Sequence, residues 1–182
     1  SRRRHTRYIS VTGVQTCALP IWVIDAQDMV AKIQVAVQTR EDPNFLIIAR
    51  TDARTTLGLD EALRRAQLYA QAGADVLFVE SPESEAEMRQ ICAELNVPCL
   101  ANMVEGGRTP VKSKAALQEI GYRMAIFPVT ALLASAHVMG EVYQQFQSQG
   151  SSQGLSVPLH DFQQFSQLMG FDWVAQFDRD HS

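Results

Sequence analysis

The chain has 182 residues, of which 46% are hydrophobic and 20% charged, and its formal net charge is −4. This composition is typical of a folded domain with a sizeable core, and it excludes collagen-like, coiled-coil and disordered chains. No apolar run approaches the ~18 residues of a membrane span, and the negative charge argues against nucleic-acid binding. Three cysteines without ligand-like spacing (Cys17, Cys92, Cys99) predict neither a zinc site nor a disulfide framework, and favour a reducing, cytoplasmic setting.

Residues 1–22 contain four arginines and no acidic residue, so the other 160 residues carry 12 basic and 20 acidic side chains, a formal charge of −8. The stretch Leu19-Pro20-Ile21 is too short for the apolar region of a signal peptide, and no amphipathic helix indicates a transit peptide. Residues 1–21 resemble translated sequencing-adapter read-through. We therefore interpret them as a non-native tail and leave them out of the fold prediction.

Predicted helices and strands alternate through the body of the chain. In order, the elements are a helix (26–38), a strand buried on both faces (45–49), a helix (60–72), a buried strand (76–79), a helix beginning at Ser84, a strand (97–101), a helix (113–120), a strand (124–127) and a helix (about 130–147). Asp60 is the expected N-cap of the second helix, and Gly73 and Gly121 follow helix ends. Strand starts about 20 to 30 residues apart predict four βα units of an α/β fold, with parallel strands and right-handed crossovers.

The last part of the chain begins with a Gly/Ser/Gln-rich connection, residues 147–154, which is typical of a flexible linker. Residues 158–178 then gather many aromatic and apolar side chains in an acidic segment. Two interpretations stay open: a packed terminal helix, or a segment that docks on a neighbouring subunit.

Polar residues follow the predicted strands, and in parallel α/β folds the carboxyl ends of the strands share one rim where ligands bind. Arg50 ends the first strand, Glu80 follows the second, and Asn102 follows the third. Arg50 offers a planar fork for a carboxylate, and Asn102 offers a neutral donor. Gly106 and Gly107 would let backbone N–H groups approach an anion. We expect this rim to bind a small carboxylate or phosphonate.

Each of these residues also has a purely structural interpretation. Arg50 and Glu80 could neutralise each other, Asp52 and Arg54 could form a pair that orders the loop, and paired glycines usually mark a turn. Glu105 could be an exposed loop acid, and His137, in an apolar helix, is expected to be a packed histidine. Cys92 and Cys99 are expected to be small core residues.

Four ordered motifs resemble the isocitrate lyase and phosphoenolpyruvate mutase superfamily. They are Ile47-Ile48-Ala49-Arg50-Thr51-Asp52-Ala53, Ala72-Gly73-Ala74-Asp75 with Phe78-Val79-Glu80, Ala101-Asn102-Met103-Val104-Glu105-Gly106-Gly107 with Thr109-Pro110, and Phe127-Pro128. The resemblance extends from about residue 22 to the C-terminus, and its order and spacing match the superfamily.

The resemblance implies a (β/α)8 barrel, a magnesium-dependent site, and chemistry on 2-oxo or 2-hydroxy carboxylic acids through an enolate-like state. Residues 22–147 would be the C-terminal half of that barrel, roughly strands five to eight. Residues 148–182 would be a linker and a helical extension that is exchanged between the subunits of a dimer or tetramer. The resemblance also implies that Arg50 holds a substrate carboxylate, that Glu80 and Asn102 line the pocket, and that Gly106 and Gly107 border it.

The superfamily's first half carries its magnesium ligands and the Cys-Gly-His loop whose cysteine acts as acid or base. Cys17 lies in Thr-Cys-Ala-Leu, so it does not inherit that role. The resemblance therefore implies no catalytic residue and no metal ligand in this chain, and we expect the chain by itself to be inactive. A complete barrel needs about 250 residues, so a partial barrel is the predicted fold.

The resemblance also narrows the substrate. Methylisocitrate lyases have an arginine five residues after the proline of the last strand, where this chain has Leu133. The stretch from Asn102 to Pro110 instead resembles the branches of carboxyphosphonoenolpyruvate mutase, dimethylmalate lyase and oxaloacetate decarboxylase. We expect C–C cleavage, by a lyase or decarboxylase, of a small dicarboxylic acid. Alternatives are a 2-methylisocitrate lyase-type enzyme, a non-catalytic half-barrel or oligomerisation module, and an unrelated phosphate-binding half-barrel.

Overall fold

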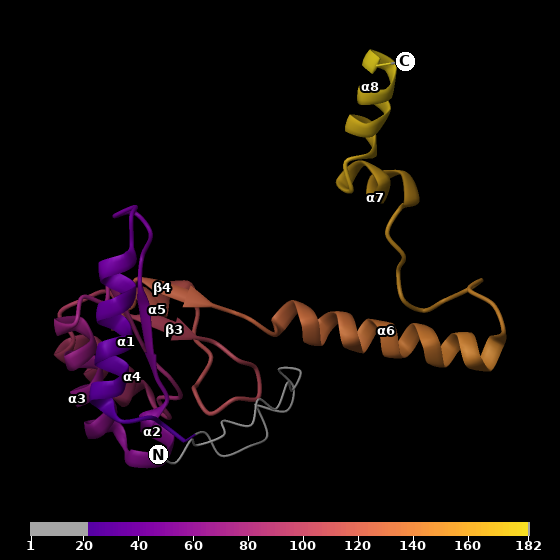
Figure 1. The fold of residues 1–182 in the computed structure, drawn as a ribbon. Helices are drawn as coiled ribbons and strands as arrows, with labels where there is room; N and C mark the ends of the chain where they lie inside the picture. Colours follow the sequence, from indigo (N-terminus) through magenta and orange to yellow (C-terminus); the bar gives the residue numbers. More distant parts are fainter. Residues whose placement is uncertain (1–21, 182) are drawn as a thin grey trace, which may run out of the picture. The chain divides into compact units, whose positions relative to one another are not determined.

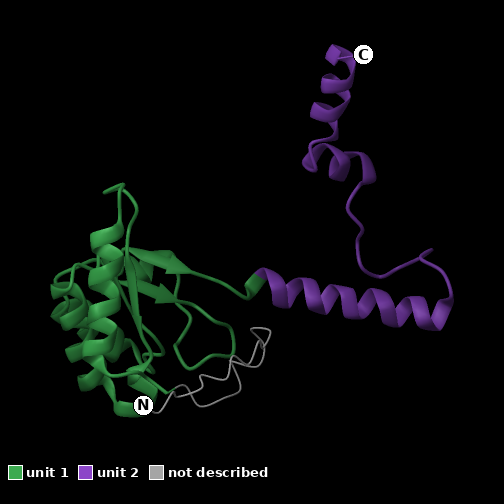
Figure 2. Ribbon diagram, viewed as in Figure 1, with its two compact units in different colours: residues 1–130 green, residues 131–182 purple. Residues whose placement is uncertain are grey.

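The computed structural model describes residues 22–181, so the tail predicted over residues 1–21 lies outside the described part. The chain divides into two compact units, residues 1–130 and residues 131–182, which Figure 2 colours separately. The division falls at the start of the helix that follows the last strand.

In the first unit, helices and strands alternate as the sequence predicts. The elements are α1 (Ala26–Thr39), β1 (Ile48–Thr51), α2 (Ala53–Leu57), α3 (Leu59–Gln71), β2 (Val76–Val79), α4 (Glu85–Glu94), β3 (Leu100–Asn102), α5 (Lys114–Ile120) and β4 (Met124–Ile126) (Figure 1). The short helix α2 is the one element of this unit that the sequence analysis does not predict.

Local side-chain chemistry explains most of the helix ends. Ser84 and Ser113 precede α4 and α5, and the hydroxyl of each accepts a hydrogen bond from a backbone N–H three residues later. Gly121 ends α5 with a φ of 122°, and a Cβ at this position would lie 2.9 Å from the Cβ of Cys92. The predicted N-cap at Asp60 is wrong, because α3 begins one residue earlier, after Gly58. Asp60 lies instead in the first turn, where a negative charge suits the helix dipole.

The first and third strands begin three residues later than predicted. Strand β1 starts at Ile48 and β3 at Leu100, and the apolar residues Phe45 and Leu46 are exposed ahead of β1. The prediction that this first strand is buried on both faces is wrong. Ala49 and Thr51 are buried while Ile48 and Arg50, which alternate with them, are exposed, because helices pack on only one face of this strand.

All four strands are parallel, as predicted. Strand β1 pairs with β2 from Ile48↔Val76 onward, and β3 pairs with β4 from Leu100↔Met124 onward. A single parallel bridge, Leu77↔Cys99, joins the two pairs. The strand order is therefore β1-β2-β3-β4, and the carboxyl ends of all four strands lie at the same edge.

The main core fills the space between the strands and the helices. Its most deeply buried large side chains are Leu77, Met88, Ile91 and Met103. Cys99 is buried in this core and Cys92 packs against it, which confirms both as small core residues. A hydrogen bond with Cys99, together with burial, raises the pKa of the Cys92 thiol, so this thiol stays protonated.

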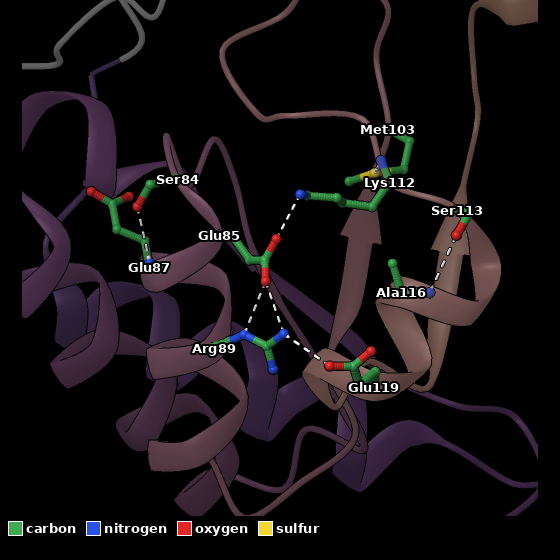
Figure 3. A network of polar contacts seen from close by, with 9 residues as sticks. All are labelled: Ser84, Glu85, Glu87, Arg89, Met103, Lys112, Ser113, Ala116 and Glu119. Carbon is green, nitrogen blue, oxygen red and sulfur yellow. Dashed lines mark hydrogen bonds and ion pairs between the residues drawn. The ribbon is translucent and has the colours of Figure 1, made fainter.

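A polar network ties α4 to α5 and to the segment before it (Figure 3). Glu85 accepts hydrogen bonds from Lys112 at 2.6 Å and from Arg89 at 2.8 Å, and Arg89 also reaches Glu119 at 3.3 Å. The hydrogen bonds from Lys112 and Arg89 hold the pKa of Glu85 below its ordinary value. These contacts fix the position of α5, which follows the loop after β3.

Glu61 is the carboxylate whose titration we expect to affect stability most. Hydrogen bonds from Arg64 and Arg65 lower its pKa from 4.5 to about 2, and Arg65 is itself buried and donates to the backbone oxygen of Ile24 at 2.7 Å. Between these two pH values the unfolded chain binds more protons than the folded chain does. The stability that Glu61 contributes is therefore complete above about pH 4.5 and is lost as the pH falls towards 2.

We predict that Glu61→Gln lowers the melting temperature at pH 7 and flattens its fall between pH 5 and about 2. Circular dichroism melts across this range measure both effects. Glu41→Gln, at an exposed position after α1, is the matched control and should reproduce the parent profile. A Glu61→Gln profile parallel to that of the parent would contradict the assignment.

The second unit contains α6 (Thr130–Gln149), whose first residue belongs to the first unit, α7 (Phe162–Leu168) and α8 (Phe171–His181). The predicted linker begins inside α6, which extends to Gln149. The terminal segment, for which a single packed helix was one interpretation, forms two helices, α7 and α8. Neither of these helices buries a residue. His137 is also exposed and lies 3.2 Å from Glu141, so its prediction as a packed histidine is wrong. Among the described helices, none is long and apolar enough to cross a membrane.

Candidate functional site

The three polar residues predicted at the rim lie at neighbouring strand ends. Arg50 is in β1, Glu80 directly follows β2, and Asn102 is the last residue of β3. Arg50 is paired in register with Phe78, so alternation along the strand places Glu80 on the same face as Arg50. The convergence of these residues follows from the parallel register of the strands.

Arg50 is held between two carboxylates. Its Nε and Nη2 donate to Oδ2 and Oδ1 of Asp52 at 3.0 and 2.7 Å, and its Nη1 lies 3.2 Å from Oε2 of Glu80. The ion pair between Arg50 and Glu80, which the sequence leaves open, is therefore present. The formal charges of the three side chains leave one negative charge in excess, so binding a dianion here requires further positive charge or the loss of one of these ion pairs. The Arg50 side chain is 44% exposed.

An aromatic ring supports the same guanidinium group. The Cζ of Arg50 lies 4.8 Å from the ring centroid of Phe78, which is buried. A cation in this position is attracted to the face of the ring. Sequence reasoning missed Phe78 because it was assigned only to a buried strand. The β1–β2 register is the signal that identifies it as the neighbour of Arg50.

Glu80 is oriented by two neutral donors. The Ser81 hydroxyl donates to its Oε1 and the Asn102 amide nitrogen donates to its Oε2, both at 3.2 Å. The N–H group of Asn102 that was predicted to contact a ligand therefore contacts Glu80. The amide oxygen of Asn102 is buried without a hydrogen-bond partner in the described protein. A buried acceptor of this kind is costly unless a ligand or water donates to it.

Ser81 has an unusual backbone conformation for a residue other than glycine. Its φ is 58°, and among the described residues it is the one non-glycine residue with a positive φ. It also precedes Pro82, and a residue before proline favours extended backbone. Strained residues of this kind concentrate at functional sites. Ser81 was not predicted as a site residue, although a Ser-Pro pair directly after a strand is a turn signal in the sequence.

We predict that Ser81→Gly is more stable than Ser81→Ala by about 1 kcal/mol, because glycine adopts a positive φ without steric cost. Urea unfolding of the two variants measures the difference. The same pair of changes at Gln90, an exposed helical position in α4, is the control, and there alanine should be the more stable residue by about 1 kcal/mol. Equal stability of the two Ser81 variants would argue against the strained conformation.

The glycine pair lies in a turn after β3. Gly106 has a φ of 75°, and the Gly107 N–H donates to the backbone oxygen of Val104 at 3.0 Å. Because the Gly107 N–H is used in this hydrogen bond, the structure conflicts with its predicted role of contacting an anion. The position of Gly107 fits the alternative interpretation, a turn. Glu105 is exposed, in agreement with its interpretation as an exposed loop acid, and it accepts a hydrogen bond from the hydroxyl of Thr130.

The predicted loop pair between Asp52 and Arg54 is wrong. Asp52 pairs with Arg50, and Arg54 reaches across to the start of α4, with hydrogen bonds of 2.7 and 3.0 Å to Glu87 and an ion pair of 2.6 Å to Glu83. The hydrogen bond from Arg54 lowers the pKa of Glu87. Partners 33 residues away in the chain are invisible to local sequence reasoning, which favoured the nearest acid.

The described residues do not fit a magnesium ion. Among residues 22–181, no group of three or more His, Cys, Asp and Glu side chains is placed to hold a metal. The two carboxylates at the rim, Asp52 and Glu80, are both committed to Arg50. These ion pairs make the arrangement suited to binding and orienting a polar ligand.

Comparison with known proteins identifies the family of this chain. The family model described as phosphoenolpyruvate phosphomutase matches residues 20–147. The chain is 39% identical over 160 residues to 2,3-dimethylmalate lyase of Eubacterium barkeri, covering 88% of this chain and 55% of that protein. It is 40% identical over 149 residues to 2-methylisocitrate lyase of Aeropyrum pernix, covering 82% and 48%.

Solved structures are also similar. A crystal structure of 2,3-dimethylmalate lyase superposes with a TM-score of 0.79 at 34% identity, covering 88% of this chain and 57% of that one. A phosphonopyruvate hydrolase in complex with oxalate and Mg²⁺ has a TM-score of 0.76 at 23% identity, covering 86% and 56%, a likeness in fold alone. The chain thus spans about half the length of the relatives it matches. It belongs to the isocitrate lyase/phosphoenolpyruvate mutase superfamily.

Proposed function

We propose that this chain is the substrate-binding part of a superfamily lyase that cleaves a C–C bond in a small 2-oxo or 2-hydroxy dicarboxylic acid. The observation that carries the proposal is the cluster of Arg50, Glu80 and Asn102 at one rim of the parallel strands. The 39% identity to a 2,3-dimethylmalate lyase supports the reaction class.

Each of these side chains has a distinct task in the proposal. The Arg50 guanidinium donates hydrogen bonds to one carboxylate of the substrate, and the ring of Phe78 holds that group in place. The buried amide oxygen of Asn102 suits a hydroxyl donor on the substrate. Glu80 orients both neighbours through its two oxygens. These residues bind and orient, and none of them is assigned a proton transfer.

The proposal assigns no metal chemistry to the described residues, because their donor set does not fit Mg²⁺. Magnesium in superfamily enzymes would supply Lewis-acid stabilisation of an enolate-like state, which is worth several kcal/mol. We therefore propose that the 182-residue chain is inactive by itself and that Mg²⁺ does not rescue it.

A dicarboxylic substrate fits this chain better than a tricarboxylic one. Leu133 stands where methylisocitrate lyases carry an additional arginine, and it is an exposed apolar residue in α6. Leucine at this position provides no positive charge, in addition to that of Arg50, for a third carboxylate. The 40% identity to a 2-methylisocitrate lyase keeps that activity as the second candidate.

We also propose that the complete protein is a homo-oligomer in which residues 148–182 dock on a neighbouring subunit. The two terminal helices expose Phe162, Phe171 and Trp173. Apolar patches of this kind mark interaction surfaces. The negative net charge of the chain favours neither nucleic acid nor anionic membranes as partners.

A chimera tests the proposed reaction. The N-terminal part of the Eubacterium barkeri 2,3-dimethylmalate lyase, up to the point where its similarity to this chain begins, is fused to residues 22–182. We expect the chimera to cleave 2,3-dimethylmalate with Mg²⁺, and the unfused chain to give no product with or without Mg²⁺. Turnover by the unfused chain would contradict its proposed inactivity. A folded chimera that cleaves only 2-methylisocitrate would favour the second candidate.

A further inference from the structure

The connection between β2 and α4, residues 80–84, is held at two positions by hydrogen bonds. At its start, the backbone N–H of Glu80 donates to the backbone oxygen of the last residue of β1 at 3.0 Å. Further along, the backbone N–H of Glu83 donates to Oε2 of Glu87 in α4 at 2.8 Å. Only two residues lie between these anchors, and the first of them is Ser81, with its φ of 58°.

Arg54 holds the second anchor from a different element. It lies in α2, and its Nε and Nη2 donate to the two carboxylate oxygens of Glu87 at 3.0 and 2.7 Å. Its Nη1 lies 2.6 Å from Oε1 of Glu83. Arg108 approaches the same oxygen at 3.5 Å, but its side chain is 58% exposed, so we expect this ion pair to contribute little. The bidentate pair of Arg54, whose side chain is 17% exposed, therefore fixes the start of α4 against α2.

The two anchors explain why Ser81 keeps its conformation. A positive φ is costly for serine, and the proline that follows favours extended backbone at this position. A strained residue persists only where the surrounding contacts determine its position more strongly than its own preference does. Without Arg54 the second anchor is weaker, and we expect Ser81 to relax towards a negative φ.

We propose that Arg54 is a positioning residue for the rim, because it holds the β2–α4 connection that sets the position of the Glu80 carboxylate. Ser81 is joined directly to Glu80, and its hydroxyl donates to Oε1 of that residue. The other oxygen, Oε2, accepts from Asn102 and lies 3.2 Å from Arg50. A change of backbone at Ser81 therefore moves the carboxylate that orients both side chains. This inference rests on the proposed function, in which Arg50 and Asn102 bind the substrate.

The affinity of the 182-residue chain for malate, measured by chemical-shift titration, tests the positioning role. We expect Arg54→Gln to weaken malate binding about 10-fold, because a displaced Glu80 no longer orients the binding groups. Arg40→Gln is the matched control. Arg40 is 18% exposed and lies 2.6 Å from Asp75, which precedes β2 at the amino ends of the strands. Its loss removes an ion pair of similar exposure and should leave malate binding unchanged.

The change Ser81→Gly separates positioning from a general structural role. Glycine adopts a positive φ without steric cost, so the connection should keep its shape even when Arg54 is lost. In the Ser81→Gly background, Arg54→Gln should therefore weaken malate binding by no more than about 2-fold. A 10-fold loss in both backgrounds, or no loss in either, would overturn the proposal.

Urea unfolding tests the hold on Ser81 without any ligand. Ser81→Gly should exceed Ser81→Ala in stability by a factor of about 5 in the unfolding equilibrium constant. This advantage should disappear with Arg54→Gln, because a relaxed backbone has no strain for glycine to relieve, and it should persist with Arg40→Gln. An advantage that survives Arg54→Gln would sink the proposal. If the parent chain binds no malate, the proposed function is wrong, and the urea comparison still decides whether Arg54 holds the connection.

Discussion

Replacing Leu77 with alanine should lower the free energy of unfolding by about 2–5 kcal/mol. Leu77 is 1% exposed at the centre of β2, and its backbone forms the bridge to Cys99 that joins the two strand pairs. Alanine loses the buried methyl groups and leaves a cavity between the strands and the helices. Domains of this size are stable by only ~5–15 kcal/mol, so this single change would remove a large part of the total.

Urea unfolding monitored by circular dichroism measures this loss as a lower midpoint with an unchanged slope. Leu57→Ala in α2 is the matched control, because Leu57 is exposed and its truncation should change stability by no more than ~0.5 kcal/mol. Similar losses for the two variants would show that the core does not depend on the strand junction at Leu77.

Replacing Arg50 with lysine should weaken the binding of a small 2-hydroxy dicarboxylate such as malate by about 10- to 100-fold. Lysine keeps the charge but loses the planar fork that pairs with Asp52 and, in the proposed function, with a substrate carboxylate. A hydrogen bond to a charged group is worth about 1.5–3 kcal/mol, which corresponds to that range of affinity. Chemical-shift titration of the labelled chain measures the affinity.

Two further variants make this result specific. Arg89→Lys changes an arginine of almost equal exposure, 46% against 44%, which also pairs with a carboxylate, and it should not alter binding. Asp52→Asn removes the excess negative charge of the group formed by Arg50, Asp52 and Glu80, and it should tighten malate binding several-fold. If Arg50→Lys bound malate as well as the parent chain does, the proposed role of Arg50 would be wrong, and its ion pairs would be structural alone.

Local sequence signals predicted the features that depend on neighbouring residues. Ser84 was correctly predicted to begin a helix, and Gly121 to end one, because caps and positive φ angles depend on residue types within a few positions. The parallel order of the strands followed from their spacing, since short intervening helices leave few other connections. From that order alone, Arg50, Glu80 and Asn102 could be placed at one rim.

Partner choice among charged residues was not predictable in the same way. Asp52 lies between Arg50 and Arg54 in the chain, and only the fold directs it to Arg50 while Arg54 reaches Glu87. The strained backbone of Ser81 and the ring of Phe78 under Arg50 likewise depend on the register between strands. These features are set by distances across the fold, which residue type and spacing do not encode locally.

The sequence by itself determined the superfamily, the alternation of helices and parallel strands, and the identity of the polar residues at their carboxyl ends. Tertiary structure alone decided that Arg50 is neutralised by its own carboxylates, that the Gly107 N–H is used within a turn, and which apolar residues stay exposed. The reason is physical. Helix caps and strand periodicity arise from interactions within a few residues, whereas ion pairing and burial depend on segments that meet only after the chain has folded.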